Sequence, residues 1–316
     1  MVAGEYAVLS GASALVVAVD ARARARLSAV GGDGSRPLAD DSPARKALPP
    51  EVLLTLREAE RALGVSPMDL TIDTSALRDR TGEGDRKLGL GSSAAGAVAA
   101  AAAVFASAGI DPSTARDRIF AAALAGHRAV APHGSGADVA SAAHGGLLRY
   151  RREGDVVEIE SLAMPRSLRA MLVWTGVPVR TSELVDRVRA SAVCDARAHG
   201  AAIDAIRDAA IALDHAFTRD DAAAIVLATR AHHDAMRALG ELADAPIVTP
   251  SLARLAEIIA ACGGASKPSG AGGGDVAIAF VPAHTDDATL RAELARHDLR
   301  VLDLALAADG ARRETD

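Results

Sequence analysis

Aromatic residues make up only 2% of the 316 positions, and the chain has no excess of positive charge. Lys and Arg number 35 against 41 Asp and Glu, which gives a net charge of −6. Base stacking needs aromatic platforms and phosphate-backbone binding needs a basic surface, so the composition argues against a nucleic-acid partner. A hydrophobic fraction of 50% indicates a globular protein with a large core of aliphatic side chains.

Cysteines and long hydrophobic runs are also scarce. Cys194 and Cys262 do not have the spacing of paired metal ligands, so we expect neither a zinc site nor a disulfide framework, and both are predicted to be buried or half-buried thiols. The Ala-rich run of residues 94–108 is shorter than the roughly 20 residues of a membrane span. The N-terminus carries Glu5 and no basic leader, unlike a secretory signal. We therefore expect a cytoplasmic protein with no membrane partner.

Residue patterns predict an α+β fold with helices packed on one face of a sheet. Two short apolar runs in residues 6–19 predict a strand-turn-strand, and residues 263–274 predict a glycine-rich loop. The predicted helices cover residues 51–63, 94–108 and 112–130, long stretches up to residue 261, and a last segment ending near residue 297. The predicted strands cover residues 22–29, 70–72, 146–150, 156–159, 171–174, 276–281 and 301–306. We place a domain boundary near residue 165, which gives domains of residues 1–165 and 166–316.

A glycine-rich turn, GLGSSAA at residues 89–95, leads into the Ala-rich helix. The N–H groups of a helix's first turn and the positive end of its dipole together bind phosphate. The hydroxyls of Ser92 and Ser93 add ligands for phosphate or Mg²⁺. This is not a Walker loop, because no GKS or GKT follows. Taken alone, the motif fits equally a helix start whose glycines only turn the chain.

Two further motifs have the composition of ligand loops. KPSGAGGGD at residues 267–275 is glycine-rich and precedes an apolar strand, so its backbone can approach a ligand closely. A flexible connecting loop is the alternative. In HGSGADVA at residues 133–140, Asp138 follows a glycine-flanked turn. By itself this pattern favours a helix N-cap over a carboxylate that points into a cleft.

These three motifs and GEYAVLSG at residues 4–11 together resemble, in order and separation, the motif set of the GHMP family of small-molecule kinases. The resemblance spans nearly the whole chain. It implies a two-domain fold, with a ribosomal-protein-S5-like ATP-binding domain at the N-terminus and a ferredoxin-like domain at the C-terminus. It also implies that ATP, Mg²⁺ and a small phosphorylated acceptor bind in a cleft between these domains.

The same resemblance assigns roles to individual residues. It implies that Asp138 is the catalytic aspartate and Ser93 the metal ligand. The residues expected to bind ATP are Lys87, Gly89, Leu90, Gly91, Ser92, Ser93 and Ala94. Those expected to bind the acceptor are Glu5, Tyr6, His127, Arg128, Ser135, Gly136, Arg180, Thr181, Lys267, Ser269, Gly270, Ala271, Gly272 and Gly273.

Within the family, the motif variants are similar to those of phosphomevalonate kinases, which convert 5-phosphomevalonate to 5-diphosphomevalonate in the mevalonate route to isoprenoids. Mevalonate kinases usually carry a glutamate eleven positions before the catalytic aspartate, and this chain has His127 there. His127 and Arg128 resemble a His-Arg pair suited to a phosphorylated acceptor, although a polar helix face is the alternative. The arginines Arg128, Arg149 and Arg180, with Lys267, are candidates for contact with the acceptor's phosphate.

The acceptor's chemistry affects the role expected of Asp138. An alcohol must lose a proton, whereas a phosphate monoester with a second pKa near ~6 is already mostly ionised at neutral pH. Asp138 is therefore expected either chiefly to orient the reacting groups or to act as a ligand through water or a metal ion. The rival functions are mevalonate kinase, another GHMP kinase, and a nucleotide-binding protein without catalysis.

The family's first motif normally begins with a strand containing PGK a few residues before GEY, and this sequence starts at Met1. We therefore expect either that the native protein starts upstream or that a catalytic lysine has been lost. The chain as written is expected to have weak activity and an exposed sheet edge. An exposed sheet edge can pair with a second copy of the chain, so a homodimer is one possible state.

Overall fold

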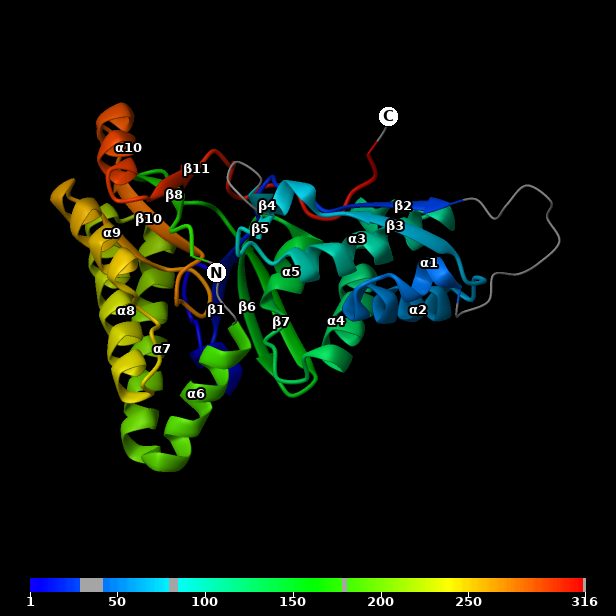
Figure 1. Ribbon diagram of the computed structural model, residues 1–316, viewed down its shortest axis with the longest axis horizontal. Coiled ribbons are helices and arrows are strands. Elements are labelled where there is room, and N and C mark those ends of the chain that lie inside the picture. The colour runs from blue at the N-terminus through cyan, green and yellow to red at the C-terminus, as the bar shows by residue number, and fades with distance from the viewer. Residues whose placement is uncertain (29–41, 80–84, 178–180, 315–316) are drawn as a thin grey trace. The chain divides into compact units, whose positions relative to one another are not determined.

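The structure, a computed structural model, describes residues 1–28, 42–79, 85–177 and 181–314. Its contacts divide the chain into two compact units, which are treated separately below (Figure 1). Unit 1 is Met1–Val17 with Leu147–Leu306, and unit 2 is Ala18–Gly146 with Ala307–Asp316. This division differs from the domains predicted at residues 1–165 and 166–316, because an N-terminal strand pairs with the strand that begins at residue 147. The family boundary near residue 165 stays a prediction.

Unit 1 contains two antiparallel sheets. The strands of the first, in order, are β1 (Ala14–Val17), β6 (Leu147–Glu153) and β7 (Val156–Leu162). Those of the second are β11 (Arg300–Leu302), β8 (Leu168–Trp174), β10 (Val276–Pro282) and β9 (Ala265–Pro268). Strand β9 lies inside the segment predicted as a glycine-rich loop, so that loop is shorter than predicted. It covers residues 269–275, between β9 and β10.

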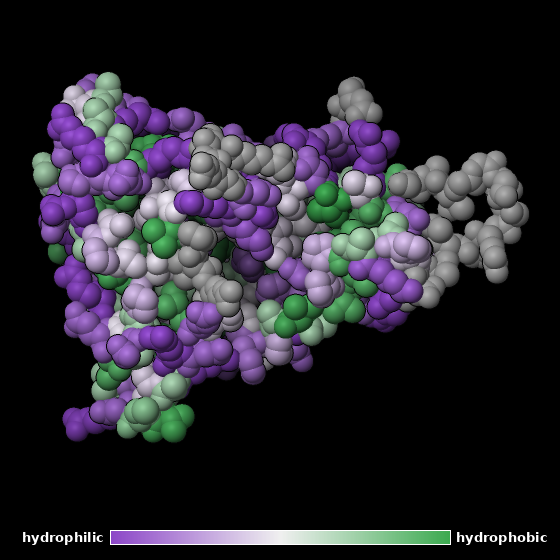
Figure 2. All heavy atoms as spheres, in the orientation of Figure 1, coloured by the Kyte–Doolittle hydropathy of each residue, from purple (hydrophilic) through white to green (hydrophobic). Residues whose placement is uncertain are grey.

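Five α-helices accompany these sheets in the described part of unit 1. They are α6 (Thr181–Cys194), α7 (Ala196–Arg219), α8 (Ala222–Leu242), α9 (Pro250–Ala261) and α10 (Asp287–Ala295). Helices α8 and α9 pack against β9 and β10 (Figure 1). Aliphatic side chains such as Val173, Leu255 and Val281 form the core between them. Hydrophilic side chains cover most of the outer face of α9 and α10 (Figure 2), which is the amphipathic pattern that predicted helices on a sheet.

The N-terminal segment differs from the predicted strand-turn-strand. Ala7–Ser10 is a 3₁₀ helix, η1, flanked by Tyr6 at φ 62° and Gly11 in the left-handed conformation. An extended strand is impossible with these dihedral angles. The expected exposed edge is also partly paired, because the N–H groups of Val2 and Ala3 donate to the carbonyl of Leu15 in β1.

Unit 2 is built mainly of helices. Its α-helices are α1 (Pro43–Lys46), α2 (Pro50–Leu63), α3 (Ser92–Ser107), α4 (Arg116–Val130) and α5 (Ala137–His144). The 3₁₀ helices η2 (Ser75–Leu77) and η3 (Pro112–Thr114) are short connections. The strand pairs are β2 (Arg24–Ser28) with β3 (Asp69–Asp73) and β4 (Arg78–Asp79) with β5 (Arg86–Lys87).

Small residues allow the helices of unit 2 to approach closely. A Cβ on Gly126 of α4 would lie 2.3 Å from Thr55 Oγ1 of α2, so only glycine fits this crossing. Nine residues of α3 are buried, most of them alanine. This packing explains how a core with few aromatic side chains is filled.

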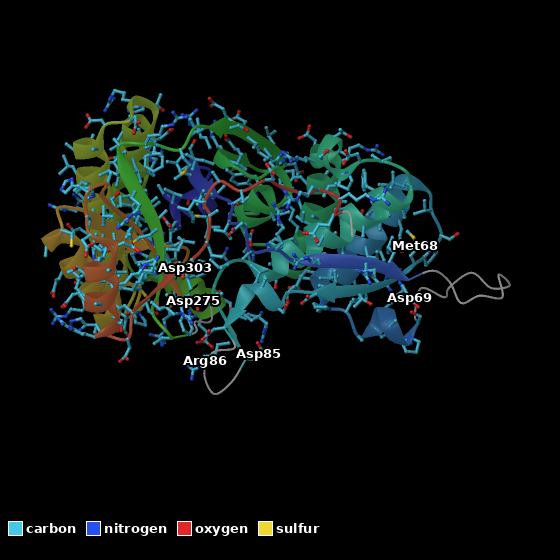
Figure 3. The ribbon with its side chains drawn as sticks, turned by 90° about the horizontal axis from the view of Figure 1, so that it is seen from above. Met68, Asp69, Asp85, Arg86, Asp275 and Asp303 are labelled. Carbon is cyan, nitrogen blue, oxygen red and sulfur yellow. The ribbon has the colours of Figure 1, made fainter. Side chains whose placement is uncertain are left out.

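A buried ion pair joins three elements of unit 2. The Arg45 guanidinium donates to Glu60 Oε1 at 2.7 Å and Oε2 at 2.9 Å, and also to the carbonyl of Met68 at 2.8 Å. The Met68 N–H in turn donates to Glu60 Oε1 at 2.9 Å. Met68 and Asp69 lie at the start of β3 (Figure 3). Both carboxylate oxygens of Glu60 are therefore bonded, and the pair ties α1 and α2 to β3.

Two further predictions concern single features. Cys262 is half-buried as predicted, but Cys194 is exposed at the end of α6, so its burial was wrongly predicted. Among the described helices, none has both the length and the hydropathy required to span a membrane.

Candidate active site

The start of α3 in unit 2 has the geometry of an anion site. Gly91, its N-cap, has φ 75° and supplies no side-chain hydrogen bond to the first turn. The first intrahelical bond runs from Ala95 N to Gly91 O at 3.0 Å. The preceding N–H groups, those of Ser92, Ser93 and Ala94, are thus uncapped by any side chain at the positive end of a 16-residue helix. Gly89 before them also has a positive φ, 74°, as a tight turn requires.

Asp138 lies beside this turn. A Cβ built on Gly91 would be 3.6 Å from the Asp138 Cβ. The N-cap of α5 is Gly136, at φ 80°, and not Asp138. The N-cap role that the local pattern favoured for Asp138 is therefore wrong. Its side chain is exposed, and Oδ1 accepts only a local bond, from Val139 N at 3.0 Å. A solvent-facing carboxylate next to a helix N-terminus is available for a ligand or a metal ion.

Other residues of unit 2 that were predicted to bind ligands lie on α4, on β5 and just before α5. His127, in the last turn of α4, lies against residues 131–134, and a Cβ on Gly134 would be 2.9 Å from His127 Nε2. Ser135 Oγ accepts from Ala137 N at 3.2 Å and so stabilises the start of α5. His127 and Arg128 are half-buried, and Lys87 is exposed on β5 just before Gly89. These segments all belong to unit 2, and their contacts with ligands stay predictions.

The glycine-rich loop of unit 1 has a defined conformation. Ser269 N donates to Val276 O at 2.9 Å, and Gly273 N donates to Ile247 O at 2.8 Å. Gly272 has φ 81°, and a Cβ there would lie 2.4 Å from Ile247 O. The loop is thus bonded to its neighbours at several points, which does not fit the alternative of a flexible connection.

Glu5 and Lys267 are paired inside unit 1. Lys267 Nζ donates to Glu5 Oε1 at 2.5 Å and to Pro268 O at 2.6 Å. The side chain of Lys267 is 0% exposed and that of Glu5 1%. Burial acts to raise the pKa of Glu5, but the charge and hydrogen bond of Lys267 together with the other positive groups nearby hold that pKa below its ordinary value. Burial lowers the pKa of Lys267, and the Glu5 carboxylate opposes this shift. Their contacts are with each other and not with open surface, which favours an indirect role over direct substrate binding.

The arginines predicted to contact phosphate divide into three cases. The Arg149 guanidinium is held by both Asp214 carboxylate oxygens, at 2.6 and 2.7 Å, and by Glu160, so its charge is already balanced within unit 1. Arg180 lies outside the described residues. Arg128 stays a candidate on α4. Thr181 begins α6, and nothing is described of its side chain.

A magnesium ion fits the donor types beside α3. Asp138 supplies one carboxylate, and Ser93 supplies a hydroxyl, which are oxygen ligands of the kind Mg²⁺ prefers. Within the described ranges, no group of three or more His, Cys, Asp or Glu side chains is placed to hold a metal ion. Mg²⁺ commonly binds through one or two carboxylates together with nucleotide phosphates. These residues therefore suit an ion that arrives with a nucleotide.

Sequence reasoning missed His232. This residue of α8 is 0% exposed, accepts a hydrogen bond from Gly4 N at 3.0 Å, and lies 3.3 Å from Glu5 Oε2. Burial lowers the pKa of its imidazole to about 4, so the ring is neutral at pH 7. It sits in an ordinary helical segment 227 positions from Glu5, and the sequence contains no local signal for this contact.

The comparisons with known proteins agree with this geometry. Residues 51–146 match the family description "GHMP kinases N terminal domain", and residues 209–298 match "GHMP kinases C terminal". The chain is 32% identical to a phosphomevalonate kinase of Streptomyces sp. (strain CL190), over 89% of this chain and 87% of that protein. It is 31% identical to a mevalonate kinase of Aeropyrum pernix, over 60% of this chain and 58% of that protein.

A solved structure has the same fold. It is that of Streptococcus pneumoniae phosphomevalonate kinase, which superposes with a TM-score of 0.79 at 21% identity and covers 96% of each chain. The family and the two-domain mixed fold that the four motifs predicted are thereby confirmed. The chain belongs to the GHMP kinase family and is a homologue of phosphomevalonate kinase.

Proposed function

We propose that this chain transfers the γ-phosphoryl group of ATP to 5-phosphomevalonate and forms 5-diphosphomevalonate. The observation that carries the proposal is the uncapped N-terminus of α3 with the exposed Asp138 beside it. It occurs in a chain that is 32% identical to a phosphomevalonate kinase over 89% of its length. The structure of the Streptococcus pneumoniae relative is described as a complex with phosphomevalonate and AMPPNP, which supports both ligands.

The ATP phosphates are assigned to the turn before α3 and its first residues. The backbone N–H groups there supply directed donors, and the helix dipole adds partial positive charge. The seven residues of this assignment are Lys87, Gly89, Leu90, Gly91, Ser92, Ser93 and Ala94. Ser93 and Asp138 would hold Mg²⁺ together with the nucleotide, and the ion would neutralise part of the phosphate charge. Phosphoryl transfer is accelerated mainly by such positioning and electrostatic stabilisation.

Each unit by itself contains residues that are candidates for contact with the acceptor. In unit 2 these are His127, Arg128, Ser135 and Gly136; in unit 1 they are Tyr6, Thr181, Ser269, Gly270, Ala271, Gly272 and Gly273, with Arg180 between the described segments. A phosphate acceptor is mostly ionised at neutral pH, so Asp138 need not remove its proton. In this proposal Asp138 orients the reacting groups.

Mevalonate kinase is the second candidate, because a mevalonate kinase is 31% identical over 60% of this chain. The residue that argues against it is His127, which stands eleven positions before Asp138. An alcohol acceptor must lose a proton to a general base, whereas a phosphate acceptor is already mostly ionised. The two activities are therefore separable by acceptor and by the effect of changing Asp138.

The test is ATP-dependent ADP release with phosphomevalonate and, separately, with mevalonate. It is run on this chain and on an N-terminally extended form. We expect turnover with phosphomevalonate only, and loss of turnover in Asp138→Asn with nucleotide binding retained. Turnover with mevalonate only would establish the second candidate. ATP binding without turnover in either form would overturn both.

A further inference from the structure

The glycine-rich loop is fastened to the N-terminal segment of the same unit by four hydrogen bonds. Ser269 Oγ donates to Met1 O at 2.8 Å and accepts from Met1 N at 2.8 Å, Gly270 N donates to Glu5 Oε1 at 3.3 Å, and Tyr6 OH donates to Ala271 O at 2.6 Å. Each bond joins one of residues 1–6 to one of three consecutive loop residues, 269–271. The position of the loop therefore depends on where residues 1–6 are held.

The backbone of that segment is strained. Tyr6 has φ 62° and ψ −49°, a conformation that a bulky aromatic residue rarely adopts. Gly4 has φ 90°, and a Cβ there would lie 2.7 Å from Ser13 O. Such conformations persist only where surrounding contacts determine them, and they are concentrated at functional sites. The contacts that hold Gly4, Glu5 and Tyr6 thus have a task beyond filling the core.

His232 supplies one of these contacts from α8. Its Nε2 accepts the Gly4 N–H at 3.0 Å, which assigns the ring proton to Nδ1. Neither His232 Nδ1 nor Glu5 Oε2 has a hydrogen-bond partner in the described structure, although both atoms are buried. A buried polar atom without a hydrogen-bond partner lowers the stability of the folded state. The two such atoms of His232 and Glu5 therefore require an explanation other than stability.

We propose that His232, acting through Gly4 and the buried Glu5–Lys267 pair, is a positioning residue that fixes the glycine-rich loop of residues 269–274 for phosphoryl transfer. Lys267 holds one oxygen of Glu5, and that same oxygen accepts the Gly270 N–H. His232 faces the other oxygen at 3.3 Å. The carboxylate is thereby fixed between β9 and the loop, while His232 Nε2, which accepts from Gly4 N, holds the segment that carries Glu5. This inference rests on the proposed function for what the loop does, and on geometry alone for what holds it.

The test combines a structural and a kinetic measurement on the full chain. The variants are His232→Leu, which removes the acceptor, and His232→Gln, which retains a polar group able to accept from Gly4. Thr229→Val is the matched control, because its buried hydroxyl bonds only Ile225 O, one turn earlier in the same helix. Glu60→Gln is a second control, which removes a buried carboxylate from unit 2.

Amide hydrogen exchange of the peptide covering residues 268–275 is the structural measurement. We expect exchange in His232→Leu to be faster by about tenfold, because a buried bond that holds the loop is lost. His232→Gln should restore slow exchange, and both control variants should leave this peptide unchanged. Unchanged exchange in His232→Leu overturns the proposal whatever the enzyme's activity. Equal acceleration in Thr229→Val also overturns it, because the effect would then be general loosening of α8.

The kinetic measurement is the separation of kcat from KM with the acceptor that the native chain uses. Displacement of a positioned loop by about 1 Å costs on the order of 100-fold in rate. We expect His232→Leu to lose kcat by about this factor with KM for ATP within about twofold, and His232→Gln to recover most of it. If the native chain turns over neither acceptor, the proposed function fails, while the exchange result still decides whether His232 holds the loop. If His232→Leu fails to fold, Lys267→Met, which releases the Glu5 carboxylate that accepts from Gly270 N, is measured instead, and unchanged loop exchange in it overturns the proposal.

Discussion

Two buried ion pairs, Arg45–Glu60 in unit 2 and Lys267–Glu5 in unit 1, differ in how completely the oxygens of their carboxylates are bonded. Both oxygens of Glu60 accept hydrogen bonds from Arg45, and Met68 adds a donor and an acceptor. Glu5 uses one oxygen for two donors, while the other has no hydrogen bond and faces a neutral histidine. A buried carboxylate with both oxygens bonded stabilises a fold, whereas a buried oxygen without a partner is costly. The comparison indicates a structural role for the first pair and a positioning role for the second.

The largest expected effect is on stability, in Glu60→Gln. A buried guanidinium cannot lose its proton, so Arg45 would remain charged without its carboxylate partner. We expect the free energy of unfolding to fall by about 3–5 kcal/mol, measured by urea denaturation. The double variant Arg45→Met with Glu60→Leu removes both charges and should be much less destabilised. Activity per folded molecule should not change. A large loss of kcat in Glu60→Gln would contradict the structural role.

The second effect is the pH dependence that His232 confers. Its folded-state pKa of about 4 lies below the ordinary value of 6.5. Between these values the unfolded chain binds a proton that the folded ring does not, so stability is fully present above pH 6.5 and is lost as the pH falls toward 4. The loss amounts to up to about 3 kcal/mol.

The measurement is the free energy of unfolding of the native chain and of His232→Gln at several pH values between 4 and 7. The variant should lose less stability as the pH falls. His144 and His233 also have lowered pKa values because they are buried, but both proteins contain them and their contributions cancel in the difference. Parallel pH curves would mean that His232 is not buried in the neutral form.

The third effect, in Lys267→Met, tests whether the second pair can adjust. Once the charge of Lys267 is removed, Glu5 or His232 can bind a proton and so reduce the unbalanced charge. Arg45 in Glu60→Gln cannot lose its proton and has no such adjustment. We expect a loss of about 1–3 kcal/mol at pH 7, less than in Glu60→Gln, and a smaller loss at pH 5 where proton uptake is easier. Urea denaturation of both variants at the two pH values measures this. A loss in Lys267→Met that equals the loss in Glu60→Gln at both pH values would remove the distinction between the pairs.

These two pairs also mark what the sequence can predict. The glycine turn at residues 89–91 and Asp138 were identified because motifs of fixed order carry them, and the helices and most strands follow local apolar patterns. The 3₁₀ helix at Ala7–Ser10 was missed, since the positive φ of Tyr6 depends on distant contacts. His232 was missed for the same reason. Lys267 was identified in a motif. Its burial against Glu5 is a long-range contact, which residue spacing along the chain does not predict.

The smallest effect is expected from Tyr6→Phe, which removes one fastening of the loop and no charge. Burial raises the pKa of the Tyr6 phenol, so the hydroxyl stays protonated and donates to Ala271 O at neutral pH. Its loss should lower the free energy of unfolding by about 1 kcal/mol, the net contribution of one neutral hydrogen bond. Exchange of the loop peptide should also rise, though less than in Lys267→Met, where the Glu5 anchor itself is released. If stability falls and exchange of the loop stays slow, the tyrosine supports only the core of unit 1, and the loop is held by the charged pair alone.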